Sequence, residues 1–473
     1  MLRSTKIVAT LGPASSDPVV LESMIRAGVD VVRLNFSHGT AEDHLKRAEL
    51  VKEIGRKVGR TVAIMCDLQG PKIRVGKFRD GKITLQKGRR FILDAGCELG
   101  DDERSGLDYK ELPRDVEAGA VLLLDDGKIV LDVIEVRGEQ VHTQVRHGGA
   151  LSNNKGINRQ GGGLTAAALT PKDIDDIRTA ARINADYLAV SFPKSGADMY
   201  MARELMRAAG GKAMLIAKIE RAEAVVQPAL LDIMNACDGI MVARGDLAVE
   251  VGDASVPALQ KKMIRLAREK NKLTITATQM MESMIASPVP TRAEVSDVAN
   301  AVLDGTDAVM LSAESASGRY PVEAIEAMDR ICIEAEQSQP VSLEQEFLNR
   351  VFTRVDQSIA MAGLFTAFHL KVKAIATLTE SGSTALWMSR LNCGVPIYAL
   401  TSQTATRYRC ALFRDVYPLM VKYVGHDREE LLAEAETVLV HHGAVQKGDL
   451  IVLTIGEPIG MAGGTNTMKI VRV

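Results

Sequence analysis

The chain has 473 residues, of which 46% are hydrophobic, and this length exceeds what one hydrophobic core usually organises. Its 58 Lys and Arg residues nearly balance 60 Asp and Glu residues, so it lacks the positive field expected of nucleic-acid or anionic-membrane binding. The six cysteines are far apart without metal-binding spacing, and no apolar run reaches the roughly 18 residues of a membrane span. We therefore expect a cytoplasmic globular protein of two or three domains, whose partners are small molecules or other subunits.

Short apolar runs recur through the first 340 residues, and each ends in polar or glycine residues that commonly lead into a helical pattern. The runs are 6–10, 30–34, 62–67, 186–190, 214–219, 239–243, 273–276 and 308–311. Eight such units predict a closed (β/α)8 barrel, whereas seven would have favoured an open doubly wound sheet. In a barrel of this kind the active site lies at the carboxyl ends of the strands, so the residues after each run become candidates.

The connection after the third strand is about a hundred residues long, which is too long for an ordinary loop. Its segments 82–86, 121–124, 128–134 and 140–145 predict strands, and Asp125-Asp126-Gly127 supplies a hairpin turn. The barrel pattern resumes at Thr170-Pro171-Lys172-Asp173, which is a typical helix start. We therefore predict a small β-barrel lid domain at 71–167, inserted into a catalytic barrel formed by 1–70 and 168–340.

A further α/β region follows Pro340, with strands predicted at 374–378, 396–400 and 450–454 and a last one near 467–473. This predicts a third domain, at 341–473. Its candidate effector ligands are Thr379, Ser381, Ser383 and Thr384, with Trp387 and Arg390 within about a turn of them and 463–467 as an opposing wall. Hydroxyls and free N–H groups in a strand-to-helix turn suit a phosphate, although the same residues also serve simply to cap helices.

Charged and polar side chains follow several strands of the predicted barrel and would converge on one rim. They are Arg33, Asn35, Ser37 and His38 after the second strand, Asp67, Lys72 and Arg74 after the third, Lys218 and Glu220 at the fifth, Arg244, Gly245 and Asp246 after the sixth, and Thr278 after the seventh. Two carboxylates among basic groups suit a hard divalent cation, Mg2+ or Mn2+, bound to an anionic substrate that completes its coordination. Phosphoryl transfer mainly needs positioning and neutralisation of oxygen charge, which a lysine, arginines and a metal provide without a covalent nucleophile.

Five ordered blocks resemble the signature sequences of the pyruvate kinase family. They are VRLNFSHG at 32–39, DLQGPKIR at 67–74, MLIAKIE at 214–220, IMVARGDL at 240–247 and ITATQMMESM at 275–284. The similarity extends over the whole chain, including the insertion and the C-terminal region. It implies phosphoryl transfer from phosphoenolpyruvate to ADP, giving pyruvate and ATP in the last step of glycolysis, by a homotetramer with an allosteric C-terminal domain.

The resemblance also implies roles for individual positions. Lys218 would stabilise the phosphoryl group in transit and the enolate left behind, while Glu220 and Asp246 would hold the divalent metal. The other implied ligands are Arg33 for the substrate phosphate, Gly245, Asp246 and Thr278 for the substrate carboxylate, and Arg74, Lys155 and His38 for the nucleotide. Thr278 would also relay a proton to the enolate. Because the C-terminal region of relatives binds phosphorylated effectors, the resemblance implies a phosphorylated sugar or nucleotide as activator.

One block departs from the better-known potassium-dependent pattern of the family. Asn35, Ser37 and Asp67 match positions around a monovalent cation, but Leu68-Gln69 stands where Thr-Lys is usual, and Lys72 stands where a glutamate follows the Gly-Pro pair. A lysine ammonium would supply the positive charge that K+ otherwise provides. We therefore expect activity without K+.

Two other interpretations of the same residues stay open. A Mg2+-dependent (β/α)8 lyase or aldolase acting on an enolate would also need two carboxylates and an arginine, although Arg74 and the long insertion argue against it. A non-catalytic sensor of phosphorylated metabolites would predict a damaged metal site, whereas Lys218, Glu220 and Asp246 are all present.

Overall fold

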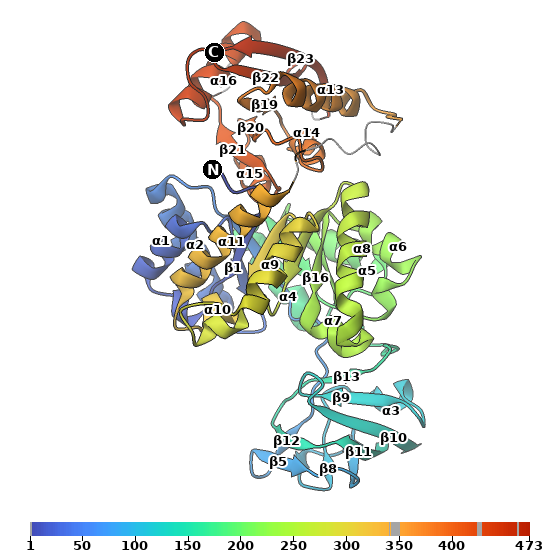
Figure 1. The fold of residues 1–473 in the computed structure, drawn as a ribbon. Helices are drawn as coiled ribbons and strands as arrows, with labels where there is room; N and C mark the ends of the chain where they lie inside the picture. The colour runs from blue at the N-terminus through green and yellow to red at the C-terminus, as the bar shows by residue number, and fades with distance from the viewer. Residues whose placement is uncertain (1, 340, 342–350, 423–427, 461–462) are drawn as a thin grey trace.

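The computed structural model describes residues 2–339, 341, 351–422, 428–460 and 463–473. Figure 1 shows three bodies in a row, with the barrel in the middle, the insertion at one end and the C-terminal region at the other. Pro340, which the sequence suggested as a boundary, lies outside the described residues. Within the described residues, no helix combines the length and the apolarity needed to cross a membrane.

Eight parallel strands close the central barrel in the order β1-β18-β17-β16-β15-β14-β3-β2. They are β1 (Lys6–Thr10), β2 (Val31–Asn35), β3 (Ala63–Asp67), β14 (Tyr187–Val190), β15 (Met214–Ile219), β16 (Gly239–Ala243), β17 (Leu273–Ala277) and β18 (Ala308–Leu311). The predicted barrel is confirmed, and every predicted strand end lies within one residue of the observed one. Six strands are buried along their whole length, as a covered parallel sheet requires, whereas β2 and β15 have partly exposed positions that include Arg33, Asn35 and Lys218.

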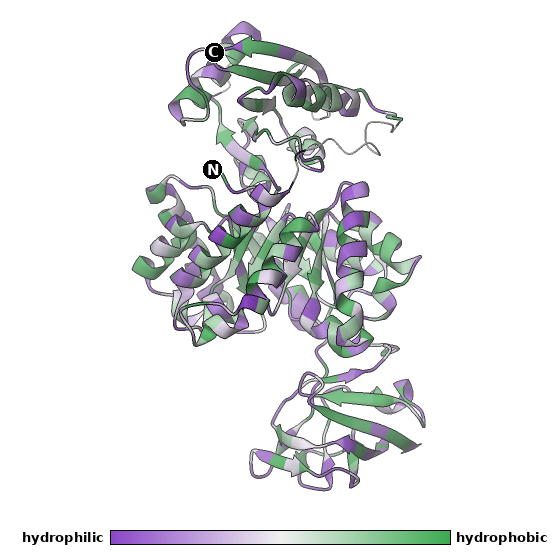
Figure 2. Ribbon diagram, in the orientation of Figure 1, coloured by the Kyte–Doolittle hydropathy of each residue, from purple (hydrophilic) through white to green (hydrophobic). Residues whose placement is uncertain are grey.

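Helices surround the barrel strands on the outside (Figure 1). They are α1 (Pro18–Ala27), α2 (Ala41–Val58), α4 (Pro171–Ile183), α5 (Gly196–Ala208), α6 (Ala229–Ala236), α7 (Arg244–Val251), α8 (Val256–Glu269), α9 (Arg292–Leu303), α10 (Ala313–Ala316) and α11 (Pro321–Ser338). Figure 2 shows hydrophobic residues gathered along the barrel strands, with hydrophilic residues on the outer faces of many helices. The main core therefore lies between the strands and the surrounding helices.

The insertion leaves the barrel after β3 and returns at α4. Gly70 has a φ of 67°, and a Cβ there would meet Ser191 Cβ at 2.7 Å, so only glycine fits. Its N–H donates to Asp173 Oδ1 at 3.0 Å, and Thr170 caps α4 by accepting from the N–H of Asp173, as the sequence predicts. The two ends of the insertion are thus joined at its base.

The insertion is a β domain with its own hydrophobic core. Its elements are β4 (Lys77–Phe78), β5 (Lys82–Leu85), β6 (Arg90–Asp94), β7 (Leu99–Gly100), β8 (Arg104–Ser105), α3 (Leu112–Asp115), β9 (Val121–Leu124), β10 (Ile129–Arg137), β11 (Gln140–His147), β12 (Gly149–Ser152) and β13 (Ile157–Arg159). One sheet has the order β13-β9-β10-β11-β6-β8, and β12–β5 and β4–β7 form two smaller sheets. The predicted turn Asp125-Asp126-Gly127 joins β9 to β10, with φ positive at all three residues.

The C-terminal region is an α/β domain with a five-stranded sheet of order β21-β20-β19-β22-β23. Its elements are α13 (Val355–Leu370), β19 (Ala374–Leu378), α14 (Ser383–Met388), β20 (Ile397–Thr401), α15 (Thr404–Cys410), β21 (Val416–Met420), α16 (Arg428–His441), β22 (Leu450–Gly456) and β23 (Thr465–Arg472). The predicted strands are present, and β21 is an edge strand that the sequence did not reveal. Only β23 runs antiparallel to its neighbour.

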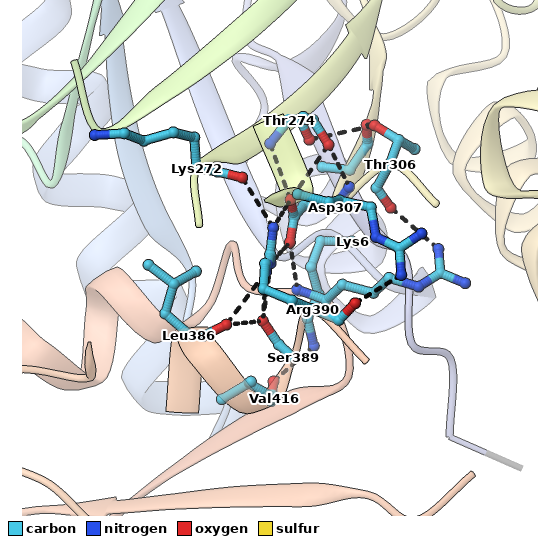
Figure 3. Close-up of polar contacts among 12 residues, drawn as sticks. Lys6, Lys272, Thr274, Thr306, Asp307, Leu386, Ser389, Arg390 and Val416 are labelled. Carbon is cyan, nitrogen blue, oxygen red and sulfur yellow. Dashed lines mark hydrogen bonds and ion pairs between the residues drawn. The ribbon is translucent and has the colours of Figure 1, made fainter. Parts of the chain in front are cut away.

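A buried ion pair joins the C-terminal domain to the amino-terminal end of the barrel (Figure 3). Arg390, just after α14, donates at 2.9 Å to Asp307 Oδ2 and also bonds Oδ1, and the two side chains are 4% and 1% exposed. Asp307 precedes β18 and accepts from the N–H of Thr274 at 2.9 Å, while Lys6 Nζ donates to the carbonyl of Val416 at 2.7 Å. Arg390 therefore serves the domain junction, although its sequence position suggested the effector turn.

Candidate active site

Lys218 lies at the centre of a polar cluster at the carboxyl end of the barrel. Its Nζ donates to Ser191 Oγ at 2.6 Å and lies 2.9 Å from Glu220 Oε1 and 3.4 Å from Asp67 Oδ1. The side chain is 12% exposed, and this burial would by itself lower the pKa of the ammonium. The carboxylates of Asp67 and Glu220 outweigh that effect and raise the pKa, so Lys218 keeps its positive charge.

Glu220 and Asp246 approach the same region from neighbouring strands, β15 and β16. Glu220 is buried and accepts from the N–H of Phe192 at 2.9 Å, and Asp246 lies in the first turn of α7, 28% exposed. Burial raises the pKa of Glu220 to about 7, with Lys218 opposing the shift and Asp246 adding to it. The two negative charges therefore repel each other, and a cation near both would relieve that repulsion.

This pair of carboxylates fits a hard divalent cation only if other ligands complete the coordination. In the described part of the chain, no three or more His, Cys, Asp and Glu side chains are grouped to hold a metal. Mg2+ usually takes one or two protein carboxylates, with substrate phosphate and water oxygens as the remaining ligands. Glu220 and Asp246 match that donor set.

Arg33 lies on the other side of Asp67 from Lys218. Its Nε donates to Asp67 Oδ2 at 2.6 Å, and a terminal nitrogen donates to Thr10 Oγ1 at 3.1 Å. Asp67 thus orients the charged side chains of Arg33 and Lys218 at the carboxyl-end rim of the barrel. Thr10 and Ser191 were not singled out from the sequence, although both stand at the carboxyl ends of strands, β1 and β14, where the same rule would have found them.

Thr278 and Gly245 are joined directly. The N–H of Gly245 donates to Thr278 Oγ1 at 2.8 Å, across the ends of β16 and β17. Thr278 and Gln279 have φ values of 69° and 53°, which is costly backbone for a β-branched residue. Arg244 holds this turn by donating to the carbonyl of Thr278 at 2.7 Å while pairing with Asp297 at 2.8 Å. The strain lies in a loop that the sequence assigned to substrate binding.

The candidate nucleotide ligands lie partly in the insertion and partly on the barrel. The backbone of Arg74 forms an isolated antiparallel β-bridge with Gly156, which follows Lys155. Arg74 and Lys155 therefore lie in adjacent segments of the lid domain. Lys155 Nζ lies 2.7 Å from Asp125 Oδ1, which raises the pKa of the lysine. His38 is exposed on the barrel, in the loop after β2, and its carbonyl accepts from His44 Nε2 at 2.9 Å.

The residues of the predicted monovalent-cation region are adjacent. Asn35 pairs in register with Asp67 across β2 and β3, and its Oδ1 accepts from the N–H of Ser37 at 3.1 Å. Lys72 lies in the segment that leaves β3 for the lid, and its Nζ is 3.9 Å from Asp246 Oδ1. The lysine ammonium is therefore next to a candidate metal carboxylate.

The candidate effector turn borders a cavity at the carboxyl ends of β19, β20 and β22. Thr379 and Thr384 line it together with Gly463 and Thr465, two residues of the predicted wall 463–467. Thr379 Oγ1 accepts from the N–H of Gly382 at 2.9 Å, and Thr384 bonds Thr465 hydroxyl to hydroxyl at 2.8 Å. Ser381 and Ser383 lie closer to the surface, with their hydroxyls 3.2 Å apart.

Known proteins resemble the chain along its full length. A family model described as the pyruvate kinase barrel domain matches residues 2–325, and one described as the pyruvate kinase alpha/beta domain matches 357–471. Pyruvate kinase II of Salmonella typhimurium is 53% identical, covering 100% of this chain and 99% of the relative. A pyruvate kinase of Haemophilus influenzae is 53% identical, covering 96% of each, and one of Sporosarcina psychrophila is 40% identical, covering 99% of this chain and 80% of the relative. The chain therefore belongs to the pyruvate kinase family and is a phosphotransferase.

Proposed function

We propose that this chain transfers a phosphoryl group from phosphoenolpyruvate to ADP, giving pyruvate and ATP. The observation that carries the proposal is the row Lys218–Asp67–Arg33, in which one buried carboxylate orients two cations toward the carboxyl rim beside Glu220. Phosphoryl transfer depends on such preorganised positive charge. The test is ATP formation from phosphoenolpyruvate and ADP by the purified protein, followed in a coupled assay.

The same assay separates the alternatives. Cleavage of a 2-oxo acid without ADP would replace the proposal with a lyase or aldolase. Absence of both turnover and divalent-metal binding would leave a non-catalytic metabolite sensor.

Arg33 and Lys218 act on the phosphoryl group. Their N–H groups donate to its oxygens while the bond to the enol oxygen breaks and a bond to a terminal ADP oxygen forms. The electron pair of the broken bond stays on the enolate oxygen, where the Lys218 ammonium stabilises it. Because Asp67 and Ser191 hold Lys218 before substrate arrives, little reorganisation is needed during the reaction.

The substrate carboxylate binds at the start of α7, where the backbone of Gly245 and Asp246 and the hydroxyl of Thr278 face the rim. The enolate then takes up a proton at its carbon atom, which completes pyruvate. Thr278 relays this proton: its hydroxyl accepts from the N–H of Gly245 and donates to the carbonyl of Ala277 at 2.6 Å, so it can turn to give that proton to the enolate carbon and regain one from water.

A divalent cation, Mg2+ or Mn2+, completes the site. When bound it neutralises charge on the phosphoryl oxygens and orients the reacting groups. Glu220 and Asp246 are its protein ligands. Burial, with repulsion from Asp246 added to it, raises the pKa of Glu220, and a bound cation would favour the ionised carboxylate, which supports this assignment.

The nucleotide lies between barrel and lid. Arg74 and Lys155 contact its phosphates from the insertion, and His38 contacts it from the barrel. In this proposal, 1–70 and 168–340 perform catalysis, 71–167 cover the site, and 341–473 regulate it.

Activity does not require K+, because the Lys72 ammonium takes the place of the ion. Support comes from the 3.9 Å approach of this ammonium to Asp246 at the rim. In tetramethylammonium buffer, KCl should change the wild-type rate less than about twofold, whereas Lys72→Glu should depend on KCl because it loses the built-in cation. Lys72→Met is the matched control, which loses the charge without gaining a carboxylate to attract K+. A large activation of the wild type by KCl would contradict the proposal.

A phosphorylated sugar or nucleotide binds at Thr379, Ser381, Ser383 and Thr384 and activates a cytoplasmic homotetramer. Support comes from the cavity that Thr379 and Thr384 line. A panel of phosphorylated metabolites should include one that lowers the KM for phosphoenolpyruvate, and Ser381→Ala with Ser383→Ala should abolish the response. Ser358→Ala, an exposed serine of α13, is the matched control. Light scattering measures the subunit number.

A further inference from the structure

The chain segment that returns from the lid is bonded to two parts of the barrel rim. The N–H of Gly161 donates to the carbonyl of Glu250 at 3.0 Å, in the last turn of α7. The N–H of Gly163 bonds Glu223, and Arg221 donates to the carbonyl of Leu164 at 3.0 Å. Both barrel segments that the lid contacts are close in sequence to a proposed metal carboxylate. Arg221 directly follows Glu220, and the first turn of α7 contains Asp246. Figure 1 shows this meeting of β13 and α7.

Glu250 touches all the parts involved. It is 5% exposed and lies four residues after Asp246 on α7, so the two side chains stand on the same face one turn apart. Its Oε2 accepts from the N–H of Ala222 at 2.8 Å, two residues after Glu220. Asn158 of β13, in the lid, lines the same cavity as Glu250 and favours the ionised form of this carboxylate, which lowers its pKa. One side chain thus connects the end of β15, helix α7 and the lid.

The helix end and the burial both disfavour a glutamate at this position, although Ala222 and Arg221 offset part of that cost. A carboxylate near the carboxyl end of a helix interacts unfavourably with the helix dipole, and burial of a charge is costly. Burial raises the pKa of Glu250 to about 7, and the nearby carboxylate of Glu223 adds to the shift. The unfavourable placement is explained if the contacts of Glu250 serve the active site instead.

The position of Glu250 links it to both proposed metal carboxylates. Lys72, Asp246 and Glu250 border one small cavity between lid and barrel, so Glu250 is near the rim chemistry without belonging to the row of Lys218 and Arg33. The backbone from Glu220 to Ala222 and the helical turn from Asp246 to Glu250 are both short and stiff. The bond between Ala222 and Glu250 therefore fixes the separation of the two carboxylates that begin these segments.

We propose that Glu250 is a positioning residue that couples docking of the lid to the placement of Glu220 and Asp246. The inference rests on the proposed function, in which these two carboxylates hold the divalent cation. With Asn158 beside the Glu250 carboxylate and Gly161 bonded to the Glu250 carbonyl, Glu220 and Asp246 keep the separation that the cation needs. When the lid swings away, Glu250 loses these partners and the pair relaxes, so cation affinity and lid docking support each other.

The test compares Glu250→Ala with Glu250→Gln, since glutamine keeps an acceptor for Ala222 and alanine does not. Mn2+ binding is measured by electron paramagnetic resonance on the full chain without substrate, alongside kcat and the KM for phosphoenolpyruvate. Glu250→Ala should weaken Mn2+ binding and lower kcat, each about tenfold, as is usual when a partner of a metal ligand is lost. Glu250→Gln should remain within about threefold of the wild type in both. Asp253→Ala, an exposed carboxylate just after α7, is the matched control and should change neither.

The outcomes distinguish this inference from the proposed function. If the wild type neither binds Mn2+ nor forms ATP, the proposed function fails. If the wild type does both and Glu250→Ala binds Mn2+ with wild-type affinity, the positioning role is overturned, even if the variant melts at a lower temperature. Hydrogen exchange at Ala222 should accelerate in Glu250→Ala, which shows that the intended bond was lost. Should Glu250→Ala fail to fold, Glu250→Asp replaces it, because the shorter side chain no longer reaches Ala222.

Discussion

The two ends of the barrel are joined to their neighbouring domains by different chemistry. At the amino-terminal end, Arg390 and Asp307 form an ion pair that is almost fully buried and bonded on every side (Figure 3). At the carboxyl end, the lid contributes backbone groups of Gly161, Gly163 and Leu164, which bond Glu250, Glu223 and Arg221 of the barrel, and Gly161, Gly162 and Gly163 all have positive φ. A buried ion pair resists separation because a lone buried charge is costly, whereas glycine-rich backbone contacts can open and close. The C-terminal junction is built for rigidity and the lid junction for motion.

Removal of the charge of Lys218 should give the largest effect on rate. Lys218→Gln should lower kcat about 10^3- to 10^4-fold, because the preorganised cation on the phosphoryl oxygens is lost. Stability should fall less than activity, since Glu220, whose pKa is about 7, can take up a proton once its partner is gone. Coupled kinetics and thermal unfolding measure the two quantities. If Lys218→Gln destabilised the protein as much as Asp307→Ala does, the separation between an active carboxyl end and a rigid amino-terminal junction would be wrong.

Removal of the carboxylate at the opposite end should give the largest effect on stability. Asp307→Ala leaves Arg390 charged and buried, which should cost about 3–5 kcal/mol, while the folded fraction keeps kcat within about tenfold. Denaturant unfolding, followed for the first transition of this multidomain chain, measures the loss. The double variant Asp307→Ala with Arg390→Met should recover part of it, because no unpaired charge remains. Equal destabilisation of the single and double variants would show that the ion pair is not the cause.

A second buried carboxyl group at the same end should make the stability depend on pH. Asp186 accepts from the N–H of Ile64 at 2.8 Å, and burial raises its pKa to about 7. Between its unfolded pKa and about 7 the folded state holds the proton and the unfolded state does not, so this group lowers stability as pH rises through that window. Asp186→Asn keeps the acceptor and should therefore exceed the wild type in stability by about 1–2 kcal/mol at pH 5 and by about 4 kcal/mol at pH 8, with equal stability only below about pH 4. A constant difference at both pH values would refute the assignment.

A change in the lid return should give the smallest effect. Gly162 has a φ of 80°, and a Cβ there would meet the carboxylate of Glu223 at 2.5 Å. Gly162→Ala should therefore displace the contacts at Gly163, raising the KM for ADP several-fold at a cost in stability of about 1 kcal/mol. Gly161→Ala is the matched control, since a Cβ there meets nothing within 4 Å although φ is 81°. If both variants raised the KM for ADP equally, the backbone strain of an alanine with positive φ, and not the contact with Glu223, would be the cause of the increase.

The sequence predicts the barrel well because its strands are continuous apolar runs whose ends are marked by polar residues. β21 was missed because it is a partly exposed edge strand that contains Pro418. The rim charges could be recognised because they follow strands directly. Thr10 and Ser191 were overlooked since uncharged hydroxyls are common after any strand.

The roles that could not be predicted from the sequence belong to residues whose partners are far away in the chain. Arg390 pairs with a residue 83 positions away, and nothing local distinguishes it from an effector ligand. Glu250 likewise reads as one more acidic residue of a helix until the lid is folded against it. A side chain whose role depends on a second domain cannot be assigned from its neighbours in sequence.

The closure at the base of the insertion has an evolutionary consequence. Gly70 is bonded to Asp173, and Thr170 caps α4 within the same turn. A shortened chain that joined 70 to 170 would keep both interactions, so the start of α4 does not depend on the hundred or so residues between them. The lid can thus be exchanged as a unit if the new lid keeps the bonds to Arg221, Glu223 and Glu250, and chimaeras that carry the lid of a relative would allow nucleotide preference to be altered.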